Sequence, residues 1–185
     1  MKHDNESPKT KILTIPNLLS CFRIALIPVI VWLYFGKQAP LLTGCTMILS
    51  GLTDLIDGYI ARKYNMVSDL GKILDPIADK LTQATMLICL SLRFPRMIIP
   101  FVLMFIKEIF MSVTGFWVVR KKGVVLGAVW HGKVATWLLY GMMVLHVFRP
   151  DLSSAVSGAT IAASSLMIAL SLVLYGIRNF KMLQN

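Results

Sequence analysis

The sequence predicts an all-α integral membrane protein, built as a bundle of six transmembrane helices. Two observations predict this class. Of the 185 residues, 56% are hydrophobic and 15% are charged, and the mean hydropathy is +0.70, which is far more apolar than an ordinary soluble domain. A bilayer crossing needs about 20 mainly apolar residues. Six stretches meet that requirement, at residues 14–35, 40–61, 73–93, 97–119, 126–148 and 154–176.

The first stretch follows a polar N-terminal segment and lacks an AxA-like cleavage site, so we expect it to remain as a membrane span. Short connections join the six stretches, and no Pro/Ser-rich linker or change of composition divides the chain. We therefore expect one transmembrane domain over residues 1–185. An even number of crossings places both termini on the same side of the membrane.

Positive charges predict the orientation of the bundle, because Lys and Arg near span ends are enriched in cytoplasmic connections. One face carries Lys2, Lys9, Lys11, Arg62, Lys63, Lys72, Arg120, Lys121, Lys122, Lys133, Arg178 and Lys181. The opposite face carries Lys37, Arg93, Arg96 and Arg149. Both termini are therefore expected in the cytoplasm, together with the connections 62–72 and 120–133, and the expected location is a bacterial cell membrane.

The formal net charge of +10 does not indicate nucleic-acid binding, because the basic residues lie at span ends rather than on a polar helix with interleaved aromatics. Membrane lipids and an anionic substrate are the expected partners instead. The three cysteines lie inside apolar stretches without CxxC spacing, so they indicate packing rather than a zinc site.

Four aspartates lie near the cytoplasmic ends of the second and third stretches. Asp54 and Asp57 are three residues apart, and Asp75 and Asp79 are four apart, so each pair shares a helix face. Two adjacent antiparallel helices can bring all four carboxylates to one depth. Helix capping or pairing with nearby Lys and Arg would explain a single aspartate, but four ionisable groups inside spans at matched spacings indicate a function.

Such a cluster repels itself unless cations neutralise it. Carboxylate oxygens suit Mg²⁺ or Mn²⁺, and these ions commonly bridge carboxylates to substrate phosphates. The four aspartates therefore predict a site for metal ions and a phosphate-bearing substrate.

The same residues match a known pattern. Asp54, Asp57, Gly58, Ala61, Arg62, Gly71, Asp75 and Asp79 stand at the spacing DxxDGxxARx₈GxxxDxxxD. This pattern resembles, without a gap, the signature of the CDP-alcohol phosphatidyltransferase family, and the chain is most similar to the phosphatidylglycerophosphate synthases of that family. The six predicted spans also resemble the family's architecture, although the last two do so only in general character.

The resemblance implies two divalent ions, Mg²⁺ or Mn²⁺, held by the four aspartates, and it implies that Asp79 is the base that takes a proton from the acceptor hydroxyl. It also implies a homodimer and a nucleotide site. The residues of that site would be Asp57, Gly58, Ala61, Arg62 and Gly71. Close helix packing is an equally good reason, on the residues alone, for three small side chains at these positions.

Within the first stretch, Pro16, Asn17, Ser20 and Arg23 resemble the opening of phosphatidylglycerophosphate and cardiolipin synthases. Pro16 and Asn17 can also simply start a helix, and Arg23 can extend its charged end to the membrane interface. The resemblance favours Asn17 and Arg23 as further nucleotide-binding residues, at the same depth as the aspartates.

The later spans hold the candidates for the acceptor site. Lys107 lies next to Glu108 among apolar residues, where the phosphatidylglycerophosphate synthases have an Arg-Glu pair and a second Arg, so Lys107 departs from their pattern. Gly132, Lys133 and Thr136 resemble the family's start of span five, which makes Lys133 and Arg120 candidates for binding an acceptor phosphate. Basic loops also serve topology or bind anionic lipid heads. Small residues at 155–159 and 162–165 predict close helix packing in the last span.

The sequence thus predicts metal-dependent transfer of a phosphatidyl group from CDP-diacylglycerol to a small phosphorylated alcohol, with glycerol 3-phosphate as the leading acceptor and CMP as the leaving product. A cardiolipin synthase that uses phosphatidylglycerol and an enzyme that uses an inositol phosphate are the alternatives within the class. A metal ion transporter is the alternative from another class, although transporter sites usually lie at the midplane on broken helices.

Overall fold

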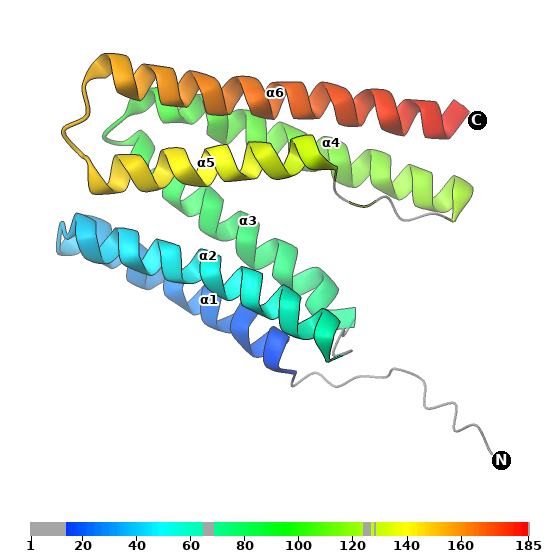
Figure 1. The fold of residues 1–185 in the computed structure, drawn as a ribbon, viewed down its shortest axis with the longest axis horizontal. Coiled ribbons are helices and arrows are strands. Elements are labelled where there is room, and N and C mark those ends of the chain that lie inside the picture. Colours follow the sequence, from blue (N-terminus) through cyan, green and yellow to red (C-terminus); the bar gives the residue numbers. More distant parts are fainter. Residues whose placement is uncertain (1–13, 65–68, 124–126, 128, 185) are drawn as a thin grey trace. The chain divides into compact units, whose positions relative to one another are not determined.

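The fold is that of a computed structural model, which describes residues 14–64, 69–123, 127 and 129–184. These residues form six long helices and contain no strand, which confirms the predicted all-α class (Figure 1). In chain order the elements are α1 (Ile15–Val31), the π-helical turn η1 (Trp32–Gly36), α2 (Pro40–Lys63), α3 (Asp69–Ser91), the 3₁₀ turn η2 (Pro95–Met97), α4 (Ile98–Lys122), α5 (Trp130–Phe148) and α6 (Ser154–Gln184).

The helices have the lengths of membrane spans. Among the described residues, three segments are long and apolar enough to cross a bilayer, at Ile15–Gly36, Pro95–Lys122 and Ser154–Gln184. The helices α2, α3 and α5 have 24, 23 and 19 residues, and 19 residues rise about 28 Å against a hydrocarbon core of about 30 Å. Their hydropathy is lower because α2 and α3 carry the aspartates and α5 carries Lys133 and two histidines.

Large apolar side chains are exposed on every one of these helices. Examples are Trp32, Leu52, Leu81, Phe116, Trp137 and Leu166. An exposed apolar surface of this extent needs an apolar solvent, and together with the span lengths it shows that this is an integral membrane protein.

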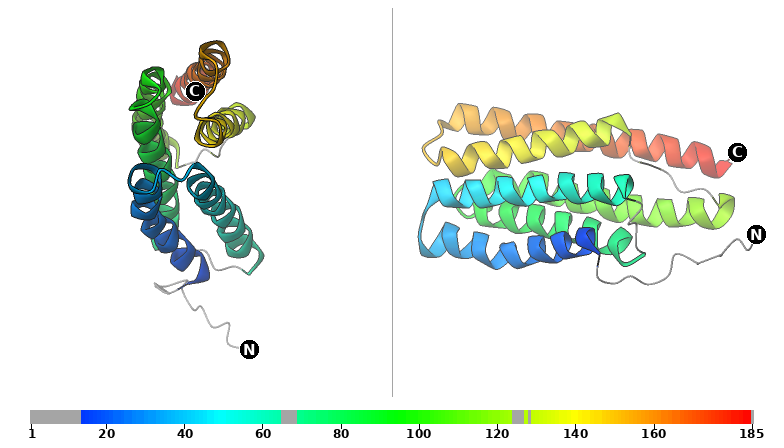
Figure 2. Two further views of the ribbon diagram at one scale, coloured as in Figure 1. Left: turned by 90° about the vertical axis from the view of Figure 1, so that its left-hand side faces the viewer. Right: turned by 60° about the horizontal axis from the view of Figure 1, so that its bottom comes forward.

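The chain divides into two compact units, Met1–Met86 and Leu87–Asn185. In the first unit, α1 and α2 are antiparallel neighbours joined by residues 37–39 (Figures 1 and 2). Thr14 caps α1, because its Oγ1 accepts a hydrogen bond from the backbone N–H of Asn17 at 3.4 Å, and Pro16 lies in the first turn. Ile30, Leu33 and Met47 form an apolar core at one end of this helix pair.

The opposite end of the same helix pair is polar. Its buried polar side chains include Ser20, Arg23, Ser50, Thr53 and Asp57. Buried polar groups are expected to be hydrogen-bonded to one another, so this end is where the predicted site has to be sought.

In the second unit, α6 packs against both α4 and α5. Its core is apolar and includes Met104, Val118, Leu139, Met143, Ile161 and Ile168. The predicted close packing of small residues holds for Ser157, Ser164 and Ser165, which are buried, and Ser164 Oγ donates to the Leu138 carbonyl at 3.1 Å. It does not hold for the alanines at 155, 159, 162 and 163, which are exposed.

Two helices have bounds that differ by several residues from those of the predicted membrane spans. The fifth helix begins at Trp130 rather than at 126, because α4 continues to Lys122 and ends at Gly123 in the left-handed conformation (φ +65°), while Val129 is still extended. The sixth helix continues to Gln184 rather than ending at 176. Neither Pro nor Gly follows Gly176, and Arg178 and Lys181 are favourable charges near a helix C-terminus.

Candidate functional site

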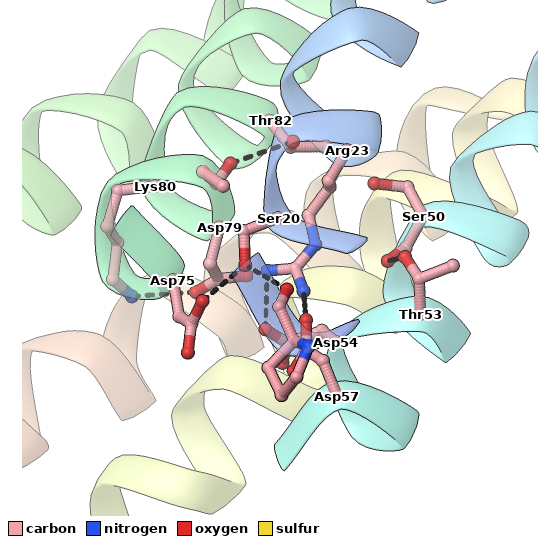
Figure 3. A network of polar contacts seen from close by, with 12 residues as sticks. Ser20, Arg23, Ser50, Thr53, Asp54, Asp57, Asp75, Asp79, Lys80 and Thr82 are labelled. Carbon is pink, nitrogen blue, oxygen red and sulfur yellow. Dashed lines mark hydrogen bonds and ion pairs between the residues drawn. The ribbon is translucent and has the colours of Figure 1, made fainter. Parts of the chain in front are cut away.

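Arg23 on α1 lies between two of the predicted aspartates on α2 (Figure 3). Its Nη1 donates to Asp54 Oδ1 at 2.5 Å, and its Nη2 donates to Asp57 Oδ2. The Arg23 and Asp57 side chains are only 1% and 2% exposed, whereas Asp54 is 39% exposed. The three-residue spacing turns both carboxylates toward α1, so one guanidinium fork contacts two acids of the next helix.

A third carboxylate joins the network through Ser20, one turn before Arg23. The Ser20 hydroxyl donates to Asp75 Oδ1 on α3, and it also lies 3.1 Å from the Pro16 carbonyl oxygen. Figure 3 shows these side chains converging from α1, α2 and α3. Three of the four predicted aspartates therefore belong to one polar network centred on α1.

Asp79, one turn after Asp75, is held by its own helix. Gln83 Nε2 donates to both carboxylate oxygens, at 3.0 Å to Oδ1 and 2.9 Å to Oδ2, and Lys80 Nζ lies 3.5 Å from Oδ2. Gln83 is buried and Asp79 is 19% exposed. Asp79 is thus fixed in orientation by an amide while one side of it stays accessible.

The chemistry of this donor set fits Mg²⁺ or Mn²⁺, because all four side chains offer carboxylate oxygens. Their present arrangement does not enclose an ion: across the described residues, no three His, Cys, Asp or Glu side chains are grouped as metal ligands. Arg23 donates hydrogen bonds to Asp54 and Asp57, and Gln83 donates hydrogen bonds to both carboxylate oxygens of Asp79. Metal binding by these aspartates requires some of those contacts to be exchanged for the ion.

Two buried polar atoms in this network have no hydrogen-bond partner within the described part of the chain. They are Arg23 Nε and Ser50 Oγ. An unpaired buried donor is costly, so the polar end of the first unit is not fully satisfied by the protein's own groups.

The other predicted nucleotide-binding residues are placed only in part. Asn17 is buried in the first turn of α1, Gly58 is half-buried on α2, and Gly71 is buried on α3. Ala61 and Arg62 belong to α2, but their side chains lie outside the described residues. A nucleotide role for this set, and for Arg23, stays a prediction.

The predicted acceptor residues all belong to the second unit. Lys107 is buried on α4, with its Nζ 3.2 Å from Glu108 Oε1. Arg120 is exposed in the last turn of α4, and Lys133 is exposed in the first turn of α5. A pocket shared by these residues and Asp79 stays a prediction.

Two contacts of the aspartates were not predicted from the sequence. Ser20 was noted as part of a pattern without a role, and Gln83 received none, whereas Lys80 was among the basic residues considered as ion-pair partners of the aspartates. A usable signal exists for Gln83, because it follows Asp79 at the i,i+4 spacing at which helical side chains meet. No local spacing links Ser20 to Asp75, which are 55 residues apart in the chain.

Comparison with known proteins decides the family. The sequence model of the CDP-alcohol phosphatidyltransferase family matches residues 13–175. The chain belongs to this family. Its match includes the complete aspartate pattern, the helices α1 to α5 and α6 as far as residue 175, so the resemblance drawn from residues 54–79 extends over most of the protein.

Relatives within the family carry two kinds of name. A CDP-diacylglycerol–glycerol-3-phosphate 3-phosphatidyltransferase of Rickettsia bellii is 42% identical over 100 residues, which are 53% of this chain and 55% of that protein. One of Sodalis glossinidius is 33% identical over 156 residues, 82% of this chain and 85% of that protein. A fusion of cardiolipin synthase (CMP-forming) and a mitochondrial hydrolase in Schizosaccharomyces pombe is 40% identical over 100 residues, half of this chain and 16% of that protein.

The chain therefore spans only about half of the Rickettsia relative and a small part of the yeast fusion protein. The family model and the Sodalis glossinidius relative show the family, and what each relative acts on is a property of that relative.

Proposed function

We propose that this protein transfers a phosphatidyl group from CDP-diacylglycerol to glycerol 3-phosphate and releases CMP. Family membership supports the reaction class, and the relatives named for glycerol-3-phosphate transfer support the acceptor. The observation that carries the proposal in the structure is the polar network of Arg23, Ser20 and three aspartates at one end of α1 and α2. We further propose that the active site and both termini are cytoplasmic and that the enzyme is a homodimer.

In the proposed reaction the acceptor hydroxyl oxygen forms a bond to the lipid-side phosphorus of the diphosphate. The bond from that phosphorus to the bridging oxygen breaks, and the bridging oxygen leaves with CMP. Asp79 takes the hydroxyl proton. Its side chain is suited to this role because Gln83 fixes its orientation and part of its surface is accessible.

The residues that would hold two divalent ions are Asp54, Asp57, Asp75 and Asp79. Bound there, Mg²⁺ or Mn²⁺ would neutralise the diphosphate and stabilise the charge on the departing phosphate. Asn17, Arg23, Gly58, Ala61, Arg62 and Gly71 would surround the nucleotide. Because Arg23 is already beside Asp54 and Asp57, it is placed to contact a diphosphate that binds against the same carboxylates.

Lys133, Arg120 and Lys107 would bind the acceptor phosphate. The position of Lys133 supports this, because a cation in the first turn of a helix is disfavoured by the helix dipole and needs another reason to be there. The backbone N–H groups of such a turn attract anions, and a lysine beside them strengthens the attraction.

Cardiolipin synthesis is the second candidate function. The relative from Schizosaccharomyces pombe and one from Streptomyces coelicolor, 40% identical over 88 residues, are named cardiolipin synthases. Lys107 stands where the glycerol-3-phosphate enzymes are expected to have Arg, which also favours a different acceptor. Phosphatidylglycerol would then replace glycerol 3-phosphate as the acceptor.

One experiment tests both candidates. Purified protein is supplied with CDP-diacylglycerol and, in separate reactions, with glycerol 3-phosphate, phosphatidylglycerol or an inositol phosphate, with Mg²⁺, with Mn²⁺ or with a chelator. We expect CMP release only with metal, and phosphatidylglycerophosphate as the lipid product. Cardiolipin as the product would replace the acceptor assignment, and the absence of CMP release with every acceptor would overturn the proposal.

A further inference from the structure

The start of α5, which carries Lys133, is held by one face of α6. Three α6 residues at i, i+4 and i+7 contact the start of α5 or Gly127 just before it, so they follow one stripe of the helix. Ser171 Oγ lies 3.0 Å from His131 Nδ1, Tyr175 Oη accepts from the Val129 N–H at 3.1 Å, and Arg178 Nη1 donates to the Gly127 carbonyl at 3.0 Å.

Tyr175 is the centre of this stripe. Val129 is the N-cap residue of α5 and makes no side-chain capping hydrogen bond, and its own backbone N–H donates to the Tyr175 hydroxyl. The Tyr175 ring also lies edge-on to His131, at 4.4 Å between ring centroids, and the Arg178 guanidinium lies 4.8 Å above its face. The ring is therefore fixed from two sides while its hydroxyl holds the entry of α5.

Gly132 allows this close approach. A Cβ added at Gly132 would meet the Tyr175 hydroxyl, and it would lie 3.1 Å from two further ring atoms. Both residues are buried, so neither can turn away into solvent. The glycine before Lys133 is thus explained by the tyrosine 43 positions later, because only a residue without a side chain leaves room for that ring.

We propose that Tyr175 is a positioning residue for acceptor binding: it fixes the backbone at Val129–Gly132 and thereby the point from which Lys133 reaches the acceptor phosphate. The inference rests on the proposed function, because it takes Lys133 as an acceptor-binding residue. It adds two residues, Tyr175 and Gly132, that touch neither substrate and act through Lys133. A lysine on a loosened turn would sample many positions, and phosphate binding would then cost the conformational entropy of fixing it in one. Holding the turn in place beforehand reduces that cost.

The test combines Tyr175→Phe, Gly132→Ala and the double variant, measured with the full-length enzyme. Tyr175→Phe removes the hydroxyl, and we expect the acceptor KM to rise roughly two- to tenfold, with the KM for CDP-diacylglycerol unchanged. Gly132→Ala should raise the acceptor KM more. In the double variant the worst clash of the new Cβ is absent, so the two effects should be less than additive. Gly141→Ala is the matched control, because a Cβ at Gly141 on the same helix meets nothing within 4 Å.

Hydrogen exchange gives a readout that does not need the acceptor assignment. In Tyr175→Phe the Val129 amide loses its acceptor, and its exchange should accelerate roughly tenfold, with little change in the middle of α5. Unchanged exchange at residues 129–133, or an equal rise in both KM values, would overturn the positioning role. A third outcome is faster exchange in Tyr175→Phe with an acceptor KM that is unchanged both in this variant and in Lys133→Ala. That result would overturn the acceptor role of Lys133, while the hydrogen bond between Val129 and Tyr175 would stand.

Discussion

The two units of the chain satisfy their buried polar groups in different ways. In the first, Arg23, Asp54 and Asp57 form a charged network between α1 and α2, and Ser20 extends it to Asp75. In the second, four hydrogen bonds between helices in the described part of the chain join neutral groups. They are His146 to Ser157, His131 to Ser171, Asn179 to Thr114, and Ser164 to the Leu138 carbonyl.

The charged and the neutral hydrogen bonds are expected to serve different purposes, catalysis and helix packing. Neutral hydrogen bonds between helices in a bilayer are worth about 0.6 kcal/mol each and are a common device for holding helices together. Ionised groups inside spans are expensive and retained where substrates or ions bind. We therefore expect changes in the charged network to affect catalysis and ion binding, and changes in the neutral hydrogen bonds away from the start of α5 to affect stability alone.

The largest effect is expected for Asp79→Asn, which removes the proposed proton acceptor at nearly constant volume. We expect kcat to fall by roughly 10²- to 10⁴-fold, while the protein stays folded and binds a CDP-lipid. Gln83 can keep its contact by rotating its amide, since the new Asn offers an acceptor and a donor. Asp151→Asn, in an exposed pair with Arg149, is the control and should leave kcat unchanged. Full activity in Asp79→Asn would end the base assignment.

Arg23→Ala should cause the next largest effect, on stability. Removing the guanidinium leaves Asp57 buried without its partner and Asp54 without one of its contacts. Breaking a buried pair costs about 3–5 kcal/mol of unfolding free energy. Because Asp54 is partly exposed, we expect the loss in Arg23→Ala to be at the lower end of that range, about 3 kcal/mol. We expect a lower unfolding temperature in detergent without metal, and a larger stabilisation by Mg²⁺ than in the wild type, because the ion replaces the lost cation.

The control for that experiment is Arg149→Ala, whose pair with Asp151 is exposed. Exposed pairs contribute little, so its unfolding temperature should match the wild type with and without Mg²⁺. A Mg²⁺ response in Arg23→Ala no greater than in the wild type would show that the ion does not bind to the carboxylates that Arg23 contacts.

Lys133→Ala tests the second unit's contribution to substrate binding. A charge-assisted hydrogen bond to phosphate is worth about 1.5–3 kcal/mol, so the acceptor KM should rise roughly ten- to a hundredfold with little change in the KM for CDP-diacylglycerol. Arg120→Ala should act in the same direction but more weakly, because Lys121 and Lys122 are next to it. Equal acceptor KM values in Lys133→Ala and wild type would limit this basic cluster to topology.

The same comparison explains what the sequence could predict. The helices and the aspartate pattern were predictable, because length, hydropathy and i,i+3 or i,i+4 spacing are local properties. The contacts of Arg23 with Asp54 and of Ser20 with Asp75 join residues 31 and 55 positions apart, and no local rule sets them. The need for a glycine at position 132 could not be predicted either, since it depends on the position of Tyr175 on another helix.

The smallest effect is expected at His146, which is buried between α5 and α6. Its Nδ1 donates to the Met142 carbonyl at 2.8 Å, so the neutral ring accepts the Ser157 hydroxyl at Nε2, at 2.9 Å. Ser157→Ala deletes that donor and should lower the free energy of unfolding by about 0.6 kcal/mol, and at most about 1.7 kcal/mol. The activity per folded molecule should not change.

Ser165→Ala is the matched control, because Ser165 is also buried on α6 but its Oγ has no hydrogen-bond partner in the described part of the chain. If Ser157→Ala reduced kcat as strongly as a change in the aspartate network does, the division between a catalytic charged network and a structural neutral one would be wrong. If both serine variants were equally stable, the hydrogen bond between His146 and Ser157 would contribute nothing to the free energy of unfolding.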